Sequence, residues 1–121
     1  MAESKVVINL STGLEDPERV IVAFLVGTAA AQQWKQVVMF LTKEAVRLAL
    51  PGHALGLACQ GCPPLEKQFA QYAEAGGQLF ACPICFNSRG LEGSALVPNA
   101  KIVGTTPLWE WIGEGATVFS Y

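Results

Sequence analysis

The stretch Leu79-Phe80-Ala81-Cys82-Pro83-Ile84-Cys85-Phe86-Asn87-Ser88-Arg89-Gly90 decides the fold. Its first three residues are apolar and indicate the end of a buried strand. Pro83 suits the first position of a helix, because its fixed φ fits there and its missing N–H is not needed. Gly90 is a typical helix end, since glycine adopts the left-handed conformation without strain. The stretch therefore predicts a strand that turns directly into a helix, with Cys82 at the junction.

The composition indicates one compact domain whose surface is partly apolar. The chain has 121 residues, enough for a hydrophobic core, and we expect a single domain over residues 1–121. Charged residues make up only 15% of the chain, against about 25% in typical soluble domains. So little charge predicts that part of the apolar surface is buried between subunits. The net charge of −2 and the lack of a Lys/Arg cluster argue against a nucleic-acid partner.

The chain shows no sign of membrane insertion or export. Its most apolar run, residues 20–31, is well short of the ~20 residues that span a bilayer. We expect a buried helix there and no membrane partner. The N-terminus lacks the layout of a signal peptide, which indicates a cytoplasmic protein. In a reducing compartment, the four cysteines favour redox or metal chemistry over structural disulfides.

Apolar runs alternate with helical segments along the whole chain. Strands are expected at residues 6–10, 36–42, 78–81, 100–104 and 117–121, and helices at residues 16–33, 43–50, 64–75, 83–89 and 106–112. Strands that alternate with helices predict an α/β fold, in which a parallel sheet is covered on both faces.

Polar or reactive residues follow the expected strands. They are Ser11-Thr12-Gly13, Thr42-Lys43-Glu44, Cys82 and Thr105-Thr106. In open parallel sheets, ligands bind beyond the carboxyl ends of the strands. We therefore expect a site around Cys82, with Thr12, Lys43 and Arg89 as substrate-binding residues.

The first interpretation of the cysteines is thiol chemistry. Cys82 is expected where the positive end of a helix dipole would stabilise a thiolate, which is the reactive form. Cys85 follows in a Cys-x-x-Cys arrangement and supplies a second thiol that can resolve a disulfide or persulfide. Cys82 and Cys85 are thus the candidate catalytic residues, and this interpretation requires no cofactor.

The second interpretation is a zinc site. Two Cys-x-x-Cys pairs, Cys59 with Cys62 and Cys82 with Cys85, have the spacing of a four-thiolate structural site. Zinc domains of this kind usually lack a core of their own, whereas this chain has ample apolar sequence. A third interpretation is that all four cysteines are small buried apolar residues.

The segment Cys82-Pro83-Ile84-Cys85-Phe86-Asn87-Ser88-Arg89-Gly90-Leu91 resembles the YchN-like branch of the DsrE/DsrF-like family, in which Cys-x-x-Cys is followed by Arg-Gly-Leu. Phe40-Leu41-Thr42, Ile102-Val103-Gly104 and Val118-Phe119 support the resemblance. The resemblance implies a three-layer α/β/α fold with a five-stranded parallel sheet. It also implies a homo-oligomer, often a trimer or hexamer.

The resemblance further implies a role in sulfur handling. In sulfur-relay members, a cysteine at the position of Cys82 holds a persulfide that passes between partner proteins. The chain would then be a sulfur carrier or sulfurtransferase with sulfur donor and acceptor proteins as partners, and Cys85 would be the neighbouring or resolving thiol. Cys59 and Cys62 match no motif of the family. Two further hypotheses stay open: a zinc-stabilised assembly module, and a small-ligand-binding oligomer without catalysis.

Overall fold

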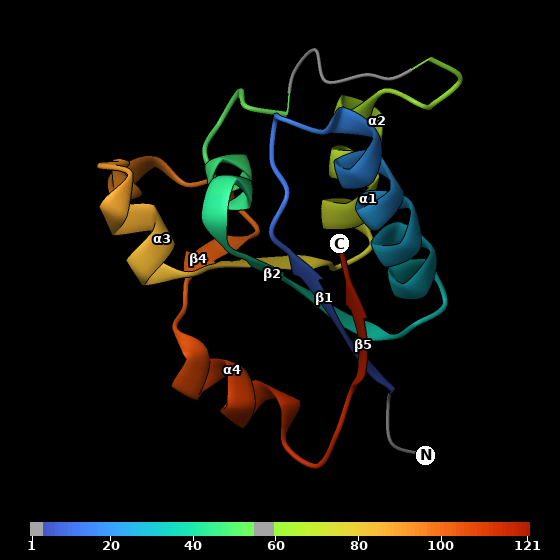
Figure 1. Ribbon diagram of the computed structural model, residues 1–121. Coiled ribbons are helices and arrows are strands. Elements are labelled where there is room, and N and C mark those ends of the chain that lie inside the picture. The colour runs from blue at the N-terminus through green and yellow to red at the C-terminus, as the bar shows by residue number, and fades with distance from the viewer. Residues whose placement is uncertain (1–3, 55–59) are drawn as a thin grey trace.

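The computed structural model describes residues 4–54 and 60–121 (Figure 1). One parallel sheet has the strand order β4-β3-β2-β1-β5. Its strands are β1 (Lys5–Leu10), β2 (Gln36–Leu41), β3 (Gln78–Ala81), β4 (Ala100–Ile102) and β5 (Thr117–Ser120). The helices are α1 (Pro17–Gln32), α2 (Leu65–Glu74), α3 (Pro83–Ser88) and α4 (Thr105–Ile112), with 3₁₀ segments η1 (Lys43–Ala49) and η2 (Gly93–Ala95). The predicted three-layer α/β/α fold with a five-stranded parallel sheet is confirmed.

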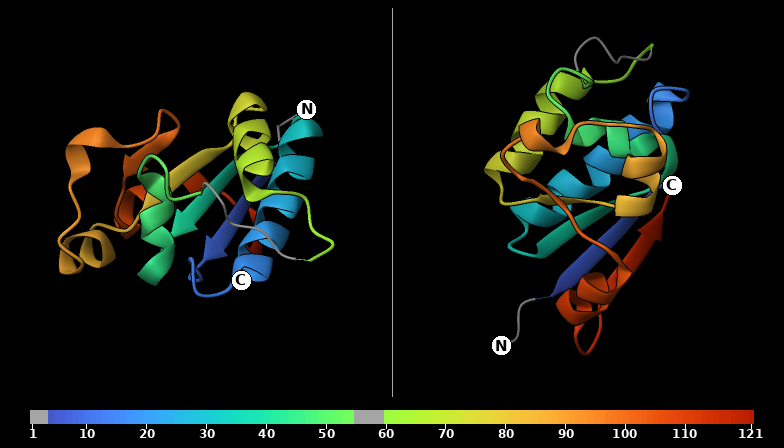
Figure 2. Two further views of the ribbon diagram at one scale, coloured as in Figure 1. Left: turned by 90° about the horizontal axis from the view of Figure 1, so that it is seen from above. Right: turned by 90° about the vertical axis from the view of Figure 1, so that its left-hand side faces the viewer.

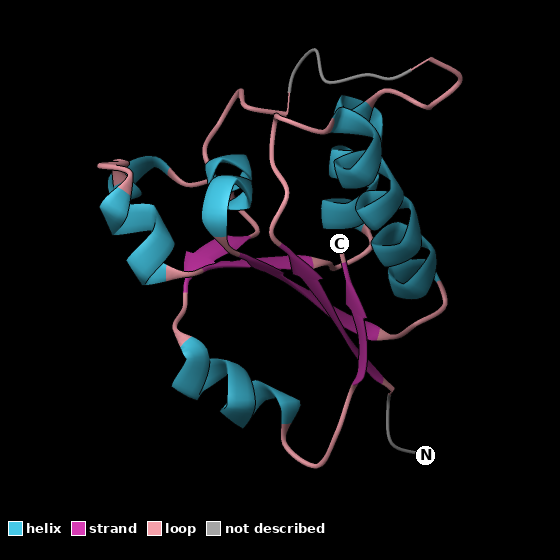
Figure 3. Ribbon diagram, in the orientation of Figure 1, coloured by secondary structure: helices cyan, strands magenta, loops and turns pink. Residues whose placement is uncertain are grey.

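The helices are divided unequally between the two faces of the sheet. α1, η1, α2 and α3 lie on one face and α4 lies alone on the other (Figures 2 and 3). The steps from β1 to β4 all run in one direction across the sheet, so right-handed crossovers place their connections on one face. The connection from β4 to β5 returns to the opposite edge and places α4 on the other face. Within the described ranges, no helix is both long and apolar enough to cross a membrane.

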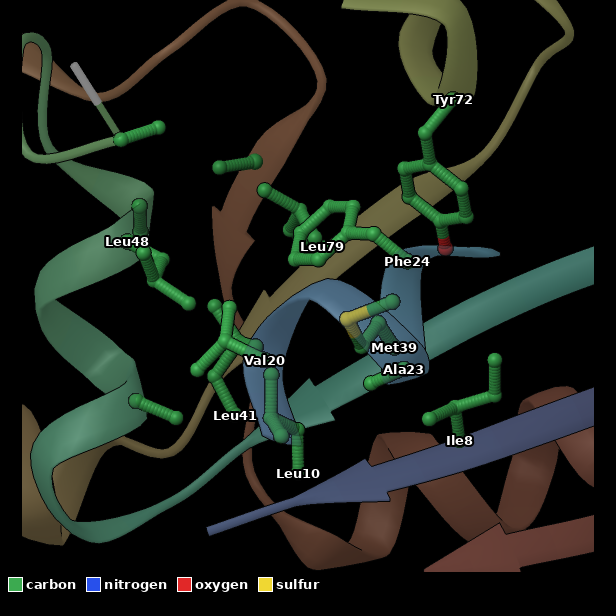
Figure 4. Packing of buried hydrophobic residues seen from close by; sticks show 14 of the residues in the cluster. Ile8, Leu10, Val20, Ala23, Phe24, Met39, Leu41, Leu48, Tyr72 and Leu79 are labelled. Carbon is green, nitrogen blue, oxygen red and sulfur yellow. The ribbon is translucent and has the colours of Figure 1, made fainter. Parts of the chain in front are cut away.

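The main core lies between the sheet and the larger helical layer. Alternate residues of the strands point into it, because side chains alternate between the faces of a sheet. Figure 4 shows this packing, with Ile8, Leu10, Met39, Leu41 and Leu79 from the sheet against Val20 and Phe24 of α1 and Tyr72 of α2. The edge of the Tyr72 ring meets the Phe24 ring, with centroids 5.4 Å apart. The helix predicted at residues 64–75 is thus confirmed, and it buries Leu65 and Tyr72 in the core.

Tyr72 links the second helix to the start of β3. Its hydroxyl donates a hydrogen bond of 2.7 Å to the carbonyl of Gln78. Burial raises the pKa of the Tyr72 phenol well above its usual range, so the side chain stays neutral and can donate. The ring packs directly against Gly77, where a Cβ would lie 2.4 Å from it. Tyr72 therefore requires the absence of a side chain at Gly77.

The hydrophobic layer between the sheet and α4 is smaller than the main core. Its buried cluster consists of Val38, Phe40 and Phe80, and the residues packed against it are only partly buried. α4 itself has no buried residue. Trp111 packs on this cluster, whereas Trp109 is 70% exposed. The two tryptophans lie two positions apart on the helix, which accounts for their different environments.

A few element boundaries differ from the sequence prediction. The expected helix at residues 43–50 is a 3₁₀ segment, and it begins with an i to i+3 bond from the Ala45 N–H to the Thr42 carbonyl. The last helix begins one residue earlier than predicted, after Gly104. The expected strand at residues 100–104 ends at Ile102. Residues 55–59, which lie between the helices predicted at 43–50 and 64–75, are outside the described residues.

Substitution of Gly77 should test the packing of Tyr72. Gly77→Ala would place a methyl group against the buried ring, and overpacking of this kind lowers the free energy of unfolding by about 1–3 kcal/mol. Chemical denaturation measures the difference. Gly104→Ala is the matched control, because its Cβ would meet only Pro83 at an ordinary 3.8 Å, and we expect a loss below about 1 kcal/mol. Equal losses in the two variants would contradict this account.

Candidate functional site

Backbone hydrogen bonds fix the position of Cys82. Its N–H donates to the carbonyl of Leu41 at 2.9 Å, one residue beyond the end of β3. The neighbouring strands continue in the same way, because Thr42 N–H donates to Leu10 and Val103 N–H donates to Ala81, each at 3.0 Å. Thr42, Cys82 and Val103 thus form one further row across the carboxyl edge of the sheet. Cys82 lies in the middle of this row.

The side chain of Cys82 lies on the α4 face of the sheet. It packs against the cluster of Val38, Phe40 and Phe80, on which Leu108 of α4 also packs. The side chain is partly buried and its thiol is free. Cys82 is the N-cap residue of α3, as predicted, but its sulfur accepts no capping hydrogen bond from the helix. Its surroundings are therefore mainly apolar, with part of the side chain accessible to solvent.

Cys85 lies on the other side of the sheet layer. It is also a partly buried free thiol, but it packs against the main core. Its carbonyl accepts hydrogen bonds from the Ser88 hydroxyl at 3.1 Å and from Nη1 of Arg89 at 3.2 Å. The two cysteines of the motif therefore contact different apolar clusters.

Arg89 forms an ion pair that the sequence did not predict. Its Nε donates to Oε2 of Glu44, and the other carboxylate oxygen of Glu44 accepts from Nε of Arg47 at 3.0 Å. The hydrogen bond from Arg89, and then that from Arg47, hold the pKa of Glu44 below its usual value. This contact ties α3 to η1 across the end of the sheet. The only local signal for Glu44 was its place in the polar stretch that follows the second strand.

The other predicted binding residues, Thr12 and Lys43, lie near the backbone of Glu44. Thr12 is buried at 7% exposure, and its neighbour Gly13 lies so close to η1 that a Cβ there would be 2.6 Å from the Glu44 carbonyl. Lys43 precedes Glu44, is exposed, and has a left-handed backbone with φ of 52°. The structure thus brings three segments together near Glu44: the loop that contains Thr12, Lys43 itself, and Arg89 at the end of α3. Substrate binding by these residues stays a prediction.

The predicted zinc set cannot be assembled from the described residues. Cys62 precedes α2 and packs against the main core, on the opposite face from Cys82. Cys59 lies outside the described ranges. Across residues 4–54 and 60–121, no group of three or more His, Cys, Asp or Glu side chains is placed to hold a metal ion. The zinc interpretation stays an untested prediction.

Cavities of about 350 and about 270 Å³ lie elsewhere on the molecule. The larger is at the amino ends of β2 and β3, and the smaller lies beside the start of α1. Cys82 lines neither. The thiol is therefore not reached through either of these cavities.

Comparison with models of protein families identifies the family of this chain. The model of the DsrE/DsrF-like family matches residues 4–121. The chain belongs to the DsrE/DsrF-like family. This family is associated with sulfur relay, and its members are often oligomeric. The resemblance inferred from the segment around Cys82 is confirmed.

Solved structures share the fold at low sequence identity. The ychN protein from E. coli is 16% identical, with a TM-score of 0.78 over 99% of this chain and 100% of that chain. MTH1491 from Methanobacterium thermoautotrophicum, a protein of unknown function, is 14% identical, with a TM-score of 0.70 over 98% and 100%. BT1422 from Bacteroides thetaiotaomicron, also of unknown function, is 16% identical, with a TM-score of 0.62 over 98% and 95%. A comparison with curated proteins finds no match.

The Glu44–Arg89 pair should make stability depend on pH in a defined direction. Because the pKa of Glu44 is lowered in the folded protein, its contribution is present above the unfolded value of about 4.3 and is lost as pH falls through the folded value. Denaturation of the wild type and Glu44→Gln at pH 7 and pH 3 should show a larger difference between the proteins at pH 7. Glu114→Gln, which removes an exposed carboxylate, is the control. A pH-independent difference for Glu44→Gln would contradict the ion pair.

Proposed function

We propose that the protein accepts sulfane sulfur as a persulfide on Cys82 and passes it to an acceptor. The observation that supports this most is the position of Cys82 itself. It is a free, partly accessible thiol at the carboxyl end of β3, between the ends of β2 and β4. The association of the family with sulfur relay supports sulfur as the cargo.

The loading step is an exchange without net oxidation. The Cys82 thiolate attacks the outer sulfur of a donor persulfide, the donor's S–S bond breaks, and the donor leaves as a thiolate. A new S–S bond forms on Cys82, which becomes a persulfide. An acceptor thiolate that attacks the outer sulfur regenerates the Cys82 thiolate in the same way. No cofactor is needed for either step.

Cys85 offers a second route of release. If its thiolate attacks the inner sulfur of the Cys82 persulfide, a Cys82–Cys85 disulfide forms and hydrosulfide leaves. The sulfane sulfur is then reduced while the two cysteines are oxidised, so a reductant thiol must restore them. Because the two side chains contact different apolar clusters, we expect this route to need a change of side-chain conformation at the start of α3. Direct transfer to an acceptor needs no such change.

We assign Thr12, Lys43 and Arg89 to the binding of the donor or acceptor. Lys43 and Arg89 are cationic, and a persulfide anion or an acidic partner surface would be attracted to them. Arg89 is held by Glu44, so a bound anion would compete with that carboxylate.

We further propose a cytoplasmic homo-oligomer, a trimer or hexamer. The edge strand β5 is exposed along its length, and Val118 and Phe119 are 57% and 41% exposed. Exposed apolar residues on an open sheet edge favour burial against another subunit.

Mass spectrometry of the loaded protein should test the function. After incubation with a small-molecule persulfide donor, wild-type protein should gain about 32 Da, one sulfur atom, on the peptide that contains Cys82. Cys82→Ser should lose this adduct. Cys85→Ser should retain it, and should hold it longer if Cys85 assists release.

Two outcomes would contradict the proposal. One is the absence of an adduct on Cys82, and the other is an adduct confined to Cys59 or Cys62. Zinc analysis of the same sample tests the alternative: about one zinc ion per four cysteines, with Cys82 protected from the donor, would favour a zinc-stabilised assembly module.

Loosening of α4 should change the reactivity of Cys82 selectively. Leu108 packs on the same three buried residues as Cys82, so Leu108→Ala should increase local opening and raise the alkylation rate of Cys82 by about twofold to fivefold. Peptide mapping after timed exposure to iodoacetamide measures the rate. Leu108→Met conserves volume and is the control. Equal acceleration at Cys85, which packs on the other face, would indicate global unfolding and contradict the selective effect.

A further inference from the structure

We propose that the cavity at the amino edge of the sheet binds a flat aromatic small molecule with an anionic group. This site is separate from Cys82, which lies at the carboxyl edge. The cavity has a volume of about 350 Å³, within the range of small-ligand pockets. Its walls come from the ends of α1 and α2, from the starts of β2 and β3, and from α4.

Trp34 is the first reason to assign a ligand. It lines the cavity and is 89% exposed, although a tryptophan gains by removing its large apolar surface from water. Its backbone is left-handed, with φ of 65°, which is unusual for a bulky residue. The Trp34 N–H donates to Ala31 and the next N–H donates to Ala30, so Trp34 occupies the helix-end position that usually holds glycine. Neither stability nor local conformation favours tryptophan there.

A second tryptophan lines the same cavity from the other side of the sheet. Trp111 belongs to α4, and its position is held by Lys5. The Lys5 Nζ lies 5.3 Å from the Trp111 ring centroid and donates a 2.6 Å hydrogen bond to the Trp111 carbonyl. Val37, Ala31 and Ala75 add small apolar surfaces to the lining. A lining with two indoles and small apolar side chains favours a planar aromatic ring.

The charge around the cavity favours an anion. Lys35 is the charged residue of its lining. The ends of α1 and α2 face this edge, but their last carbonyls already accept backbone hydrogen bonds from residues 33–35 and 75–77. The negative ends of these helices are therefore largely satisfied, and the Lys35 ammonium is left to bind a carboxylate, sulfonate or phosphate.

A matched pair of probes should test the site. Naphthalene-1-sulfonate and 1-naphthylmethylammonium share a ring system and differ in charge. Titration of the ¹⁵N-labelled protein should show that the sulfonate shifts the indole N–H signals of Trp34 and Trp111, with the exposed Trp109 unaffected. The ammonium probe should bind at least about threefold more weakly, because Lys35 opposes it.

Three variants define the expected response. Trp34→Asn should weaken sulfonate binding about fivefold to tenfold through loss of one aromatic wall, and Lys35→Gln should weaken it about threefold. Trp109→Asn is the control and should bind as the wild type does. Because asparagine tolerates a positive φ better than tryptophan, Trp34→Asn should melt no lower than the wild type. Loading of Cys82 with sulfur should be unchanged in Trp34→Asn.

Several results would overturn the proposal. They are equal binding of the two probes, equal shifts at Trp109, and unchanged affinity in Trp34→Asn. A lower melting temperature for Trp34→Asn would assign Trp34 a packing role instead. A change of oligomeric state in Trp34→Asn, measured by size-exclusion chromatography, would show that a second copy of the chain covers the cavity.

Discussion

The hydrogen bond from the Cys82 N–H to the Leu41 carbonyl determines where the thiol points. It extends the parallel ladder by one residue, so the alternation of side chains continues past the end of β3. Cys82 therefore shares the α4 face with Phe80, and Ala81 shares the main core with Leu79. A shift of one residue in this register would turn the sulfur into the main core. The chemistry of the site thus depends on backbone pairing before it depends on any neighbouring side chain.

The direction of the crossovers places most of the hydrophobic core on one face of the sheet and leaves the Cys82 face with less cover. Successive right-handed connections stack α1, η1 and α2 on one face, where most of the buried apolar residues gather. The single return connection leaves α4 to cover the other face, over the buried cluster of Val38, Phe40 and Phe80. The smaller cover on the α4 face leaves the Cys82 thiol partly accessible, while the main core holds the sheet together. The unequal cover of the two faces also leaves apolar residues such as Val118 and Trp109 exposed. This agrees with the observation that members of the family are often oligomeric.

Local patterns in the sequence predict the elements well and the side-chain contacts poorly. Residues 78–81 and the helix that starts at Pro83 are where the pattern placed them, because alternation, proline and glycine act over a few residues. The pair between Glu44 and Arg89 joins residues far apart in the chain, and no local periodicity signals such a contact. The motif also gave no sign that Cys82 and Cys85 pack on different clusters, since that division follows from the sheet register. Cys59 lies outside the described residues, so its predicted role is untested.

The two edges of the sheet differ in the residues that their loops need. At the carboxyl edge, the loops after the strands supply polar and reactive groups, and the family resemblance falls on this edge. At the amino edge, the ends of α1 and α2 need only small or flexible residues to turn, and Gly76 does this after α2 with a positive φ. The equivalent turn after α1 uses Trp34 under the same conformational demand. Glycine or asparagine would give the more stable protein at both turns. The tryptophan at position 34 is therefore better explained by ligand binding, because its indole can stack on a bound aromatic ring.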